Sequence, residues 1–535
     1  GYIDLVWLPQ SGKCMETTQV MGYMPYYYFN QNSSFGSEAE LRSLITKFKA
    51  AGIGAIADVV VNHRNTEGWY KFPAETYKGV TYQMQPTDIC KNDDGGETAT
   101  HAATDGVSLS QNNDEGTDFG GCRDIDHKSE NVQKVIKAYL KYLKDDLGYT
   151  GFRYDMVKGY SGKFTGIYNT AIKPTYSIGE YWDGNVSVIK NWLNATKVND
   201  QITSAAFDFP IRYVVRDAIK ANWSTVKTDG LANDPAYKQY AVTFVENHDT
   251  EYRSAGEQQD PIRKDTLAAN AYILASCGTP CVFYKHWIDC KQDIKAMINA
   301  RQMAGITNTS NTTFNAYKGD GFNGILTTGT KTSLLAIVGP NANKFEVSNA
   351  YVEILNGYHY RYFMSKKANV AWVNLASGEY EGAQMAKLVA VSNKDNAQLV
   401  YTTDGTEPTA SSKKAKSGEE IELPIGETTL KVGLLVDGAV SSVITRTYQI
   451  TKPADFEPYD ITVYANADQV GWKDGFNFWA WCEKPDENLT ATNKWPGDKV
   501  TQCKEIEGKK WYYQTYKIKS CLLYTSPSPR DTERS

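Results

Sequence analysis

The chain has 535 residues, a length that predicts roughly two to four domains. Its 41% hydrophobic and 22% charged residues are typical of a soluble globular protein that buries a large core. The net charge of −5 gives no electrostatic reason to expect nucleic acid as a partner. The 36 tyrosines and 12 tryptophans suit a protein that binds carbohydrate, although large cores also use aromatic residues.

The nine cysteines show no CxxC or Cys/His spacing, which argues against a zinc site. Cys482 and Cys503 lie close enough in sequence to pair, whereas Cys277 and Cys281 are expected to be small buried apolar residues. The longest apolar run, residues 267–284, is interrupted by asparagine, glycine and proline. It therefore predicts a buried helix followed by a strand and no membrane span.

The chain opens directly on a core strand within residues 1–9. A helix is predicted over residues 37–51, with Ser37 as N-cap and Glu40 at the capping-box position. A strand follows at 53–63. Residues 64–123 are rich in Gly, Asn and Asp, and so long a loop in a compact domain is usually functional.

An amphipathic helix at 132–147 leads into the strand that organises the chain, in which Phe152 and Tyr154 alternate with Arg153 and Asp155. The arginine beside Asp155 is expected to lower the pKa of that carboxyl and to hold it ionised. An ionised aspartate at the carboxyl end of a strand suits a covalent nucleophile. On this strand alone, a structural Arg–Asp pair would explain the pattern better.

Three other strands end in polar residues, in a fixed order along the chain. The first ends at Asn62 and His63, the second at Glu180 and the third at His248-Asp249. With the Asp155 strand, these segments resemble the four signature regions of the α-amylase family of glycoside hydrolases, particularly the plant-type enzymes and their bacterial relatives. The stretches 124–127 and 283–289 also fit, and the resemblance covers roughly residues 1–375.

The resemblance implies an α/β fold, a (β/α)8 TIM barrel, followed by all-β accessory domains. The opening strand matches the second barrel strand, so the first strand, its helix and any export signal are expected to be missing. A barrel without one strand has an open edge.

Beyond residue 308 the pattern changes to short strands and turns, including strands at 334–338 and 358–362. The implied organisation is a catalytic barrel at 1–307 with a calcium-binding insertion at about 64–123, an antiparallel β-domain at 308–376, a β-sandwich repeat module at 377–452, a starch-binding-like β-module at 453–519, and a tail at 520–535 that looks like translated sequencing-adapter read-through.

Retaining cleavage of a glycosidic bond needs two carboxyl groups roughly 5–5.5 Å apart. By the resemblance, Asp155 is the nucleophile and Glu180 the acid/base, with Tyr181 and Trp182 supplying an apolar setting that raises a carboxyl pKa. Asp249 is a third carboxylate that supports the cation-like transition state. The implied substrate contacts are Tyr28 (or Tyr27, since the tyrosine run aligns ambiguously), His63, Arg153, Lys158, Trp182 and His248.

The implied cofactor is calcium, a hard cation that takes six to eight oxygen ligands. The matching ligands are Asn62, Asp114, Asp124 and the carbonyl of Gly159, with Asp118 and Asp126 as secondary candidates. Such a set would tie the long loop to the strand end that carries Asp155. A solvated acidic loop is the alternative.

In the last module, Trp479 and Trp481 alternate with Phe478 and Ala480, so the two tryptophans share one face of a strand. If exposed, they would form a stacking platform for an α-glucan, which Tyr464 could extend. The alternative is that they belong to the sandwich core.

The sequence thus predicts an extracellular or cell-surface, monomeric, calcium-dependent enzyme that hydrolyses internal α-1,4 bonds of starch with retention. Transglycosylation, maltogenic cleavage and attack on α-1,6 bonds remain open, as does a catalytically silent starch-binding protein. Secretion follows from the family and from an insoluble substrate, not from a visible signal.

Overall fold

The computed structural model describes residues 1–15, 21–254, 257–258, 260–453, 457–466, 476–483, 486–488 and 497–518. The chain divides into two compact units, one made of residues 1–378, 385–421 and 429–447, the other of residues 379–384, 422–428 and 448–535. The tail at 520–535 lies outside the described residues.

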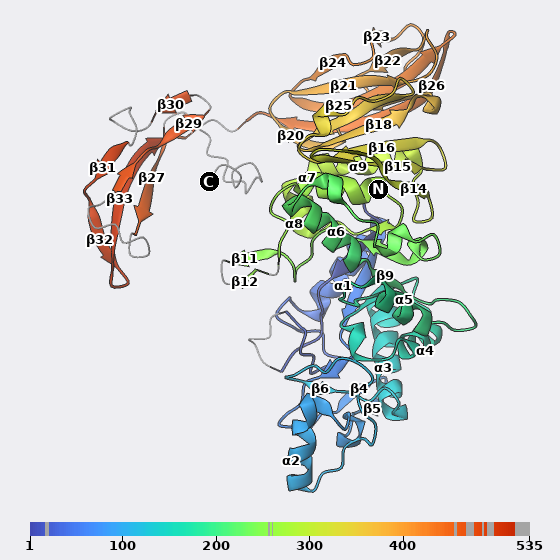
Figure 1. The fold of residues 1–535 in the computed structure, drawn as a ribbon, viewed down its shortest axis with the longest axis vertical. Coiled ribbons are helices and arrows are strands. Elements are labelled where there is room, and N and C mark those ends of the chain that lie inside the picture. The colour runs from blue at the N-terminus through green and yellow to red at the C-terminus, as the bar shows by residue number, and fades with distance from the viewer. Residues whose placement is uncertain are drawn as a thin grey trace. The chain divides into compact units, whose positions relative to one another are not determined.

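A seven-stranded parallel sheet forms the centre of the first unit, with strand order β1-β2-β7-β8-β9-β10-β13 (Figure 1). The strands are β1 Leu5–Leu8, β2 Gly54–Val59, β7 Gly151–Tyr154, β8 Tyr176–Gly179, β9 Ala205–Phe207, β10 Ala241–Thr243 and β13 Thr279–Pro280. Neighbours in the sheet follow one another along the chain, as in a (β/α)8 barrel. The predicted fold class is confirmed, with seven barrel strands among the described residues.

Helices connect these strands. Their bounds are α1 Glu38–Ala50, α3 Glu130–Lys141, α4 Gly162–Ile172, α5 Val186–Ala195, α6 Phe209–Lys220, α7 Thr266–Ala275, α8 Tyr284–Asp289 and α9 Lys291–Ala304. Helix α1 begins as predicted: the Ser37 hydroxyl accepts from the Glu40 backbone N–H while the Glu40 carboxylate accepts from that of Ser37. The helix predicted at 132–147 is α3 followed by a π-helical turn, Tyr142–Leu147. None of the helices in the described ranges has the length and apolar character needed to cross a membrane.

The long segment after β2 folds over the carboxyl end of the sheet. It contains β3 His63–Arg64, β4 Glu75–Tyr77, β5 Val80–Tyr82, α2 Glu97–Asp105 and β6 Arg123–Asp124. Strands β3 and β6 pair antiparallel, with His63 opposite Asp124. Because of this pairing, the end of the insertion returns to the end of β2, where the insertion began. The acidic residues of the insertion therefore lie beside the sheet.

An antiparallel five-stranded sheet of order β14-β15-β16-β18-β17 follows. Its strands are β14 Asn311–Gly319, β15 Phe322–Thr328, β16 Ser333–Val338, β17 Tyr351–Gly357 and β18 Tyr360–Ser365. The strand predicted at 334–338 is confirmed. The strand predicted at 358–362 begins only at Tyr360, because His359 has a positive φ of 58° and belongs to the hairpin turn.

Two further sheets have the orders β19-β21-β24 and β20-β26-β25-β22-β23. Their strands are β19 Val370–Val373, β20 Gly378–Glu381, β21 Gln384–Val391, β22 Gln398–Thr402, β23 Lys413–Ala415, β24 Glu420–Leu423, β25 Gly426–Val436 and β26 Ala439–Thr451. The last strands form one sheet of order β27-β33-β32 and the pairs β28-β31 and β29-β30. They are β27 Tyr459–Ala465, β28 Phe476–Phe478, β29 Trp481–Glu483, β30 Asp486–Asn488, β31 Asp498–Val500, β32 Cys503–Ile506 and β33 Lys509–Ile518.

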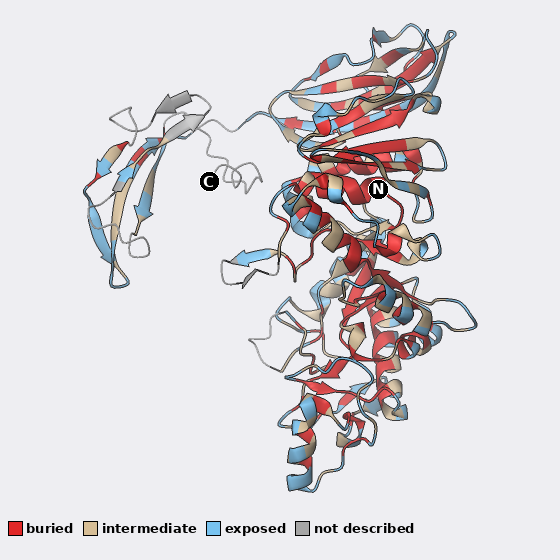
Figure 2. Cartoon of the chain, in the orientation of Figure 1, coloured by how far each residue is buried: buried red, intermediate tan, exposed pale blue. Residues whose placement is uncertain are grey.

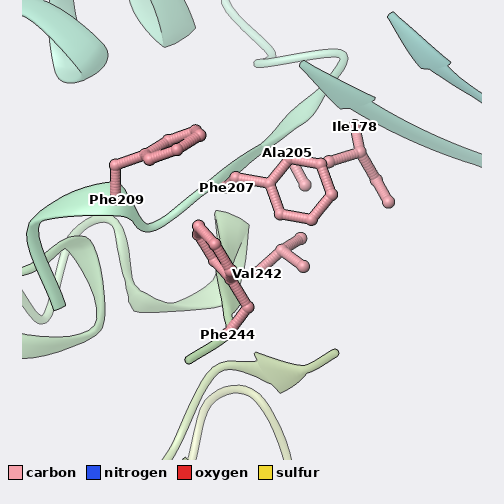
Figure 3. Close-up of a cluster of buried hydrophobic side chains, with 6 residues drawn as sticks. All are labelled: Ile178, Ala205, Phe207, Phe209, Val242 and Phe244. Carbon is pink, nitrogen blue, oxygen red and sulfur yellow. The ribbon is translucent and has the colours of Figure 1, made fainter. Parts of the chain in front are cut away.

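Buried residues follow the strands of the parallel sheet and the inner faces of its helices (Figure 2). One core cluster lies where β8, β9 and β10 end and α6 begins, and it includes Phe207, Phe209 and Phe244 (Figure 3). The rings of Phe207 and Phe209 each meet the ring of Phe244 edge to face, at centroid distances of 5.4 and 5.0 Å. Such pairs stabilise a core beyond the area that they bury.

Truncating Phe244 to alanine should lower the free energy of unfolding by about 3–5 kcal/mol, since the side chain is buried and the cavity cannot be filled by its rigid neighbours. Urea unfolding monitored by tryptophan fluorescence measures the effect. The control, Phe35→Ala, removes a ring that is 52% exposed and should change the midpoint little. Equal shifts for both variants would contradict the assignment of Phe244 to the core.

Candidate active site

Three buried carboxylates surround the guanidinium of Arg153 at the carboxyl ends of neighbouring strands. Arg153 Nη1 lies 2.8 Å from Asp58 Oδ1 and 2.6 Å from Asp155 Oδ1, and Nη2 lies 2.8 Å from Glu180 Oε1. Asp58 and Arg153 are register partners in β2 and β7, Asp155 follows β7, and Glu180 follows β8. The parallel sheet therefore brings Asp155 and Glu180 together, as the sequence predicted.

One shared cation changes the expected electrostatics of Asp155. Burial raises the pKa of Asp155 well above its usual range; Arg153 opposes this, while Glu180 and Asp58 add to it. The prediction that Arg153 lowers this pKa is wrong in its net direction, because burial, together with the charges of Glu180 and Asp58, outweighs the effect of Arg153. Burial likewise raises the pKa of Glu180, whereas Arg153 and the backbone N–H of Met156 lower it.

A second group of side chains lines the same strand ends. The Tyr23 hydroxyl donates to Asp58 Oδ2 at 2.8 Å and lies 2.8 Å from His248 Nε2. The rings of Tyr23 and His248 are stacked with an interplanar angle of 7°, and His248 Nε2 is 3.2 Å from Asp249 Oδ2. Trp7 meets the His248 ring edge to face. Asp249, a quarter to a third exposed, thus lies beside the Arg153 cluster.

Sequence reasoning missed Asp58 and Tyr23. A usable signal existed for Asp58, a lone charge inside an apolar strand, since a buried charge needs a partner. No local signal marks Tyr23, which comes from a loop and reaches the site only through tertiary contacts.

Two predicted substrate contacts are placed in the core. Tyr28 is fully buried, stacked on Tyr139 with Arg64 over its ring, so it offers no face to a ligand and this prediction is corrected. His63 is 1% exposed, its Nε2 is 2.8 Å from the carbonyl of Tyr23, and its ring lies 3.7 Å from that of Phe119. Burial lowers the pKa of His63 to about 4, which keeps the ring neutral.

The remaining predicted contacts are half-buried. Trp182 donates through Nε1 to the Tyr213 hydroxyl at 2.7 Å, and one of its faces stacks on Phe209. The carbonyl of Lys158 accepts from the N–H of Thr117 at 3.0 Å, which ties the insertion to the strand end after β7.

Acidic residues of the insertion converge beside that strand end. Carboxylate oxygens of Asp93, Asp118 and Asp124 lie within 4.8 Å of one another. Asn62 Nδ2 is 3.1 Å from Asp124 Oδ1, and a Cβ at Gly159 would collide with the Asn62 side chain. The structure therefore brings Asn62, Gly159, Asp118 and Asp124 together and adds Asp93, which the sequence reasoning missed.

The chemistry of this acidic cluster fits a divalent cation. Burial raises the pKa of Asp124 to about 9 and that of Asp114 to about 6. The buried Asp114 Oδ2 has no hydrogen-bond partner. Oxygen ligands of this kind are those that calcium takes. Asp126 is not one of the three carboxylates that converge, and Ser110 and Asn112 donate to it.

The predicted accessory residues belong to the second unit. Tyr464 lies on β27 opposite Tyr513 and is 39% exposed, with the Lys504 ammonium 4.6 Å from its ring centre. Trp479 is half-buried directly after β28, and the side chain of Trp481 lies outside the described residues. Cys503 is an exposed free thiol, which argues against its pairing with Cys482.

Comparison with known proteins agrees with the barrel. Residues 3–312, more than half of the chain, match the model of the α-amylase catalytic domain. The chain therefore belongs to the α-amylase family of glycoside hydrolases and carries its catalytic domain. Residues 375–446 match the C-terminal domain of chitobiase and β-hexosaminidase, which overlaps the β-sandwich module predicted at 377–452. The starch-binding-like module stays a prediction.

Among curated relatives, the chain is 31% identical over 312 residues to probable α-amylase 2 of Arabidopsis thaliana, covering 55% of this chain and 70% of that protein. It is 28% identical over 346 residues to glucan 1,4-α-maltotetraohydrolase of Stutzerimonas stutzeri, covering 60% of this chain and 57% of that protein. Among solved structures, the γ-CGTase of an alkalophilic Bacillus clarkii aligns with a TM-score of 0.51 at 15% identity over 97% of this chain and 84% of that one, a likeness of fold.

Arg153→Met should destabilise the protein by about 3–5 kcal/mol at pH 8, because it leaves three buried carboxylates without a cation. The loss should shrink toward pH 4. Raised carboxyl pKa values mean that the folded variant binds protons more tightly than the unfolded chain, so its stability falls as pH rises.

Urea midpoints at the two pH values measure this loss. Arg42→Met, which breaks an exposed pair with Glu38, should cost less than about 1 kcal/mol and serves as control. A loss that does not depend on pH would contradict the electrostatic account.

Proposed function

We propose that the protein hydrolyses internal α-1,4-glucosidic bonds of starch and related α-glucans with retention of configuration. The observation that carries this proposal is the pair of buried carboxylates, Asp155 and Glu180, joined by one guanidinium at adjacent strand ends. Retaining glycosidases need two such carboxyl groups facing one sugar. The relative from Stutzerimonas stutzeri is named for an α-1,4-glucan substrate, which supports the same bond.

Glu180 acts first as the general acid. Burial raises its pKa, which favours the protonated form that delivers a proton to the leaving glycosidic oxygen. Asp155 attacks the anomeric carbon as the C–O bond breaks, and Arg153, 2.6 Å away, stabilises its ionised form. In this proposed first step Glu180 holds the proton, and Asp155 is ionised and acts as the nucleophile.

The second half of the reaction reverses these roles. Ionised Glu180 takes a proton from water, the water oxygen attacks the anomeric carbon, and the bond to Asp155 breaks. Asp249 and His248 bind sugar hydroxyls and stabilise positive charge at the ring. Tyr23, stacked on His248, presents an aromatic ring to the same sugar.

Trp182 and Lys158 extend the binding surface beyond the cleaved bond. Tyr28 and His63 are buried and act beneath the binding surface. The His63 ring contacts the carbonyl of Tyr23 and so helps to hold the loop that carries Tyr23.

Calcium is the proposed resident ion, held by Asn62, Asp114, Asp118, Asp124 and the carbonyl of Gly159, with Asp93 beside them. Bound calcium would neutralise the buried carboxylates and tie the insertion to the strand end that follows Asp155. The residues themselves already set that connection through Thr117 and Lys158.

The proposed setting is extracellular or at the cell surface, with the protein acting as a monomer. A polymeric substrate favours this location, and Tyr464, Trp479 and Trp481 of the second unit are proposed to bind glucan.

Asp155→Asn should lower reducing-sugar release from soluble starch by at least about 10³-fold, because the amide cannot form the glycosyl ester. Asp105→Asn, on the exposed end of α2, is the matched control and should keep parental activity. Products from amylose and pullulan separate α-1,4 hydrolysis from transglycosylation and α-1,6 cleavage. A parent that binds starch without cleaving it would overturn the proposal in favour of a binding protein.

Excess chelator should lower the thermal midpoint, and calcium should restore it, more strongly at pH 8 than at pH 5. The sign follows from Asp114 and Asp124, whose pKa values of about 6 and about 9 mean that ligand oxygens must lose protons before they bind a cation. Differential scanning calorimetry at both pH values measures the shift. An unchanged midpoint in chelator at pH 8 would eliminate the calcium site.

A further inference from the structure

We propose that Glu246, Thr250 and Arg212 form a buried positioning network that aims Asp249 at the Asp155–Glu180 pair. The proposal rests on the proposed function, since it concerns how a third carboxylate of the same site is held. None of the three residues contacts the reacting carboxylates; they act through the turn that carries Asp249.

The turn after β10 is fixed on both sides of Asp249. Asn247 Oδ1 accepts from the backbone N–H groups of Asp249, at 3.1 Å, and Thr250, at 2.9 Å. The Thr250 hydroxyl accepts from the Asn247 backbone N–H at 3.1 Å. The hydroxyl of Thr250 has a single proton, which it donates to the nearby carboxylate oxygen Glu246 Oε1. Thr250 therefore joins the turn to a buried carboxylate.

Glu246 is the anchor of this turn. Its side chain is 2% exposed, and it accepts from Arg212 Nη2 at 3.2 Å and from the backbone N–H of Ile262 at 2.6 Å. A buried ion pair adds little net stability, because desolvation offsets the attraction. What such a pair supplies at this place is a single orientation for the groups bound to it.

Arg212 connects the network to a rigid helix. It lies on α6, and its Nη2 also donates to the carbonyl of Asp260 at 2.7 Å. One and two turns further along α6, Arg216 and Lys220 pair with the Asp260 carboxylate. The strand end before Asp249 and the segment returning at 260–262 are thereby held to the same helix.

The orientation of Asp249 matters for Glu180. The charged or titratable groups that act on Glu180 are Arg153, Asp155, Asp58 and Asp249. Asp249 raises the pKa of Glu180, so an Asp249 that swings away would leave an acid that loses its proton at lower pH. A displacement of about 1 Å also costs about 100-fold in rate.

The decisive variants are Thr250→Val and Thr250→Ser in the full chain. Valine keeps the shape of threonine but neither donates to Glu246 nor accepts from Asn247, whereas serine does both. The matched control is Thr243→Val on β10, because the buried Thr243 hydroxyl has no hydrogen-bond partner to lose. The measurements are kcat, KM, the pH profile of kcat/KM on a soluble maltooligosaccharide, and the thermal midpoint.

Thr250→Val should lower kcat by about 100-fold with little change in KM, and the basic limb of its pH profile should move to lower pH. Thr250→Ser and Thr243→Val should behave like the parent. A Thr250→Val enzyme with parental kcat and pH profile overturns the network.

Two other outcomes also overturn it. One is a fall in activity that follows only a lower thermal midpoint, with the pH profile unmoved, since that marks a structural role. The other is a parent that cleaves no α-glucan, which fails the proposed function itself and is thereby distinguished from failure of the network alone.

Discussion

The buried guanidinium of Arg153 is the interaction on which the site depends. Three carboxylates from three neighbouring strand ends converge on it, and none of them could be buried there without a cation. The parallel sheet makes this possible, because consecutive strands deliver their carboxyl ends to one edge. This one positive charge faces three carboxylates, and burial raises the pKa of Asp155 and of Glu180.

Carboxylates also lie close together in the insertion, where their negative charge is balanced differently. Asp93, Asp118 and Asp124 lie close together, and Arg123 partly compensates Asp93. Burial raises the pKa of Asp114 and of Asp124, and the charges of neighbouring aspartates add to the rise. Gly159, which lies against Asn62 beside the acidic cluster, follows Asp155 by only four residues, and the Lys158 carbonyl accepts from Thr117, so the insertion is held to the strand end that carries Asp155.

Asp249 is held by a third arrangement, in which a buried ion pair fixes a turn. Hydrogen bonds connect Arg212 and Glu246, through Thr250, to the turn that carries Asp249. The carboxylates of the site are thus held in two ways. Asp155 and Glu180 share the guanidinium of Arg153, and Asp249 is held by the network anchored on α6. Both supports lie within residues 3–312, the part of the chain that matches the α-amylase catalytic domain.

The sequence by itself determined the local elements and the order of the polar strand ends. Ser37 and Glu40 specify the start of α1 through contacts three residues apart, and Asp155 and Glu180 lie where their strands end. Such features depend on neighbouring residues, so a linear pattern contains them. Only the tertiary structure decided which tyrosine reaches the site, since Tyr28 packs on Tyr139 while Tyr23 reaches His248, 225 positions away. It also decided the net direction of the Asp155 pKa, because burial and the sharing of one arginine among three acids depend on how distant strands are packed together.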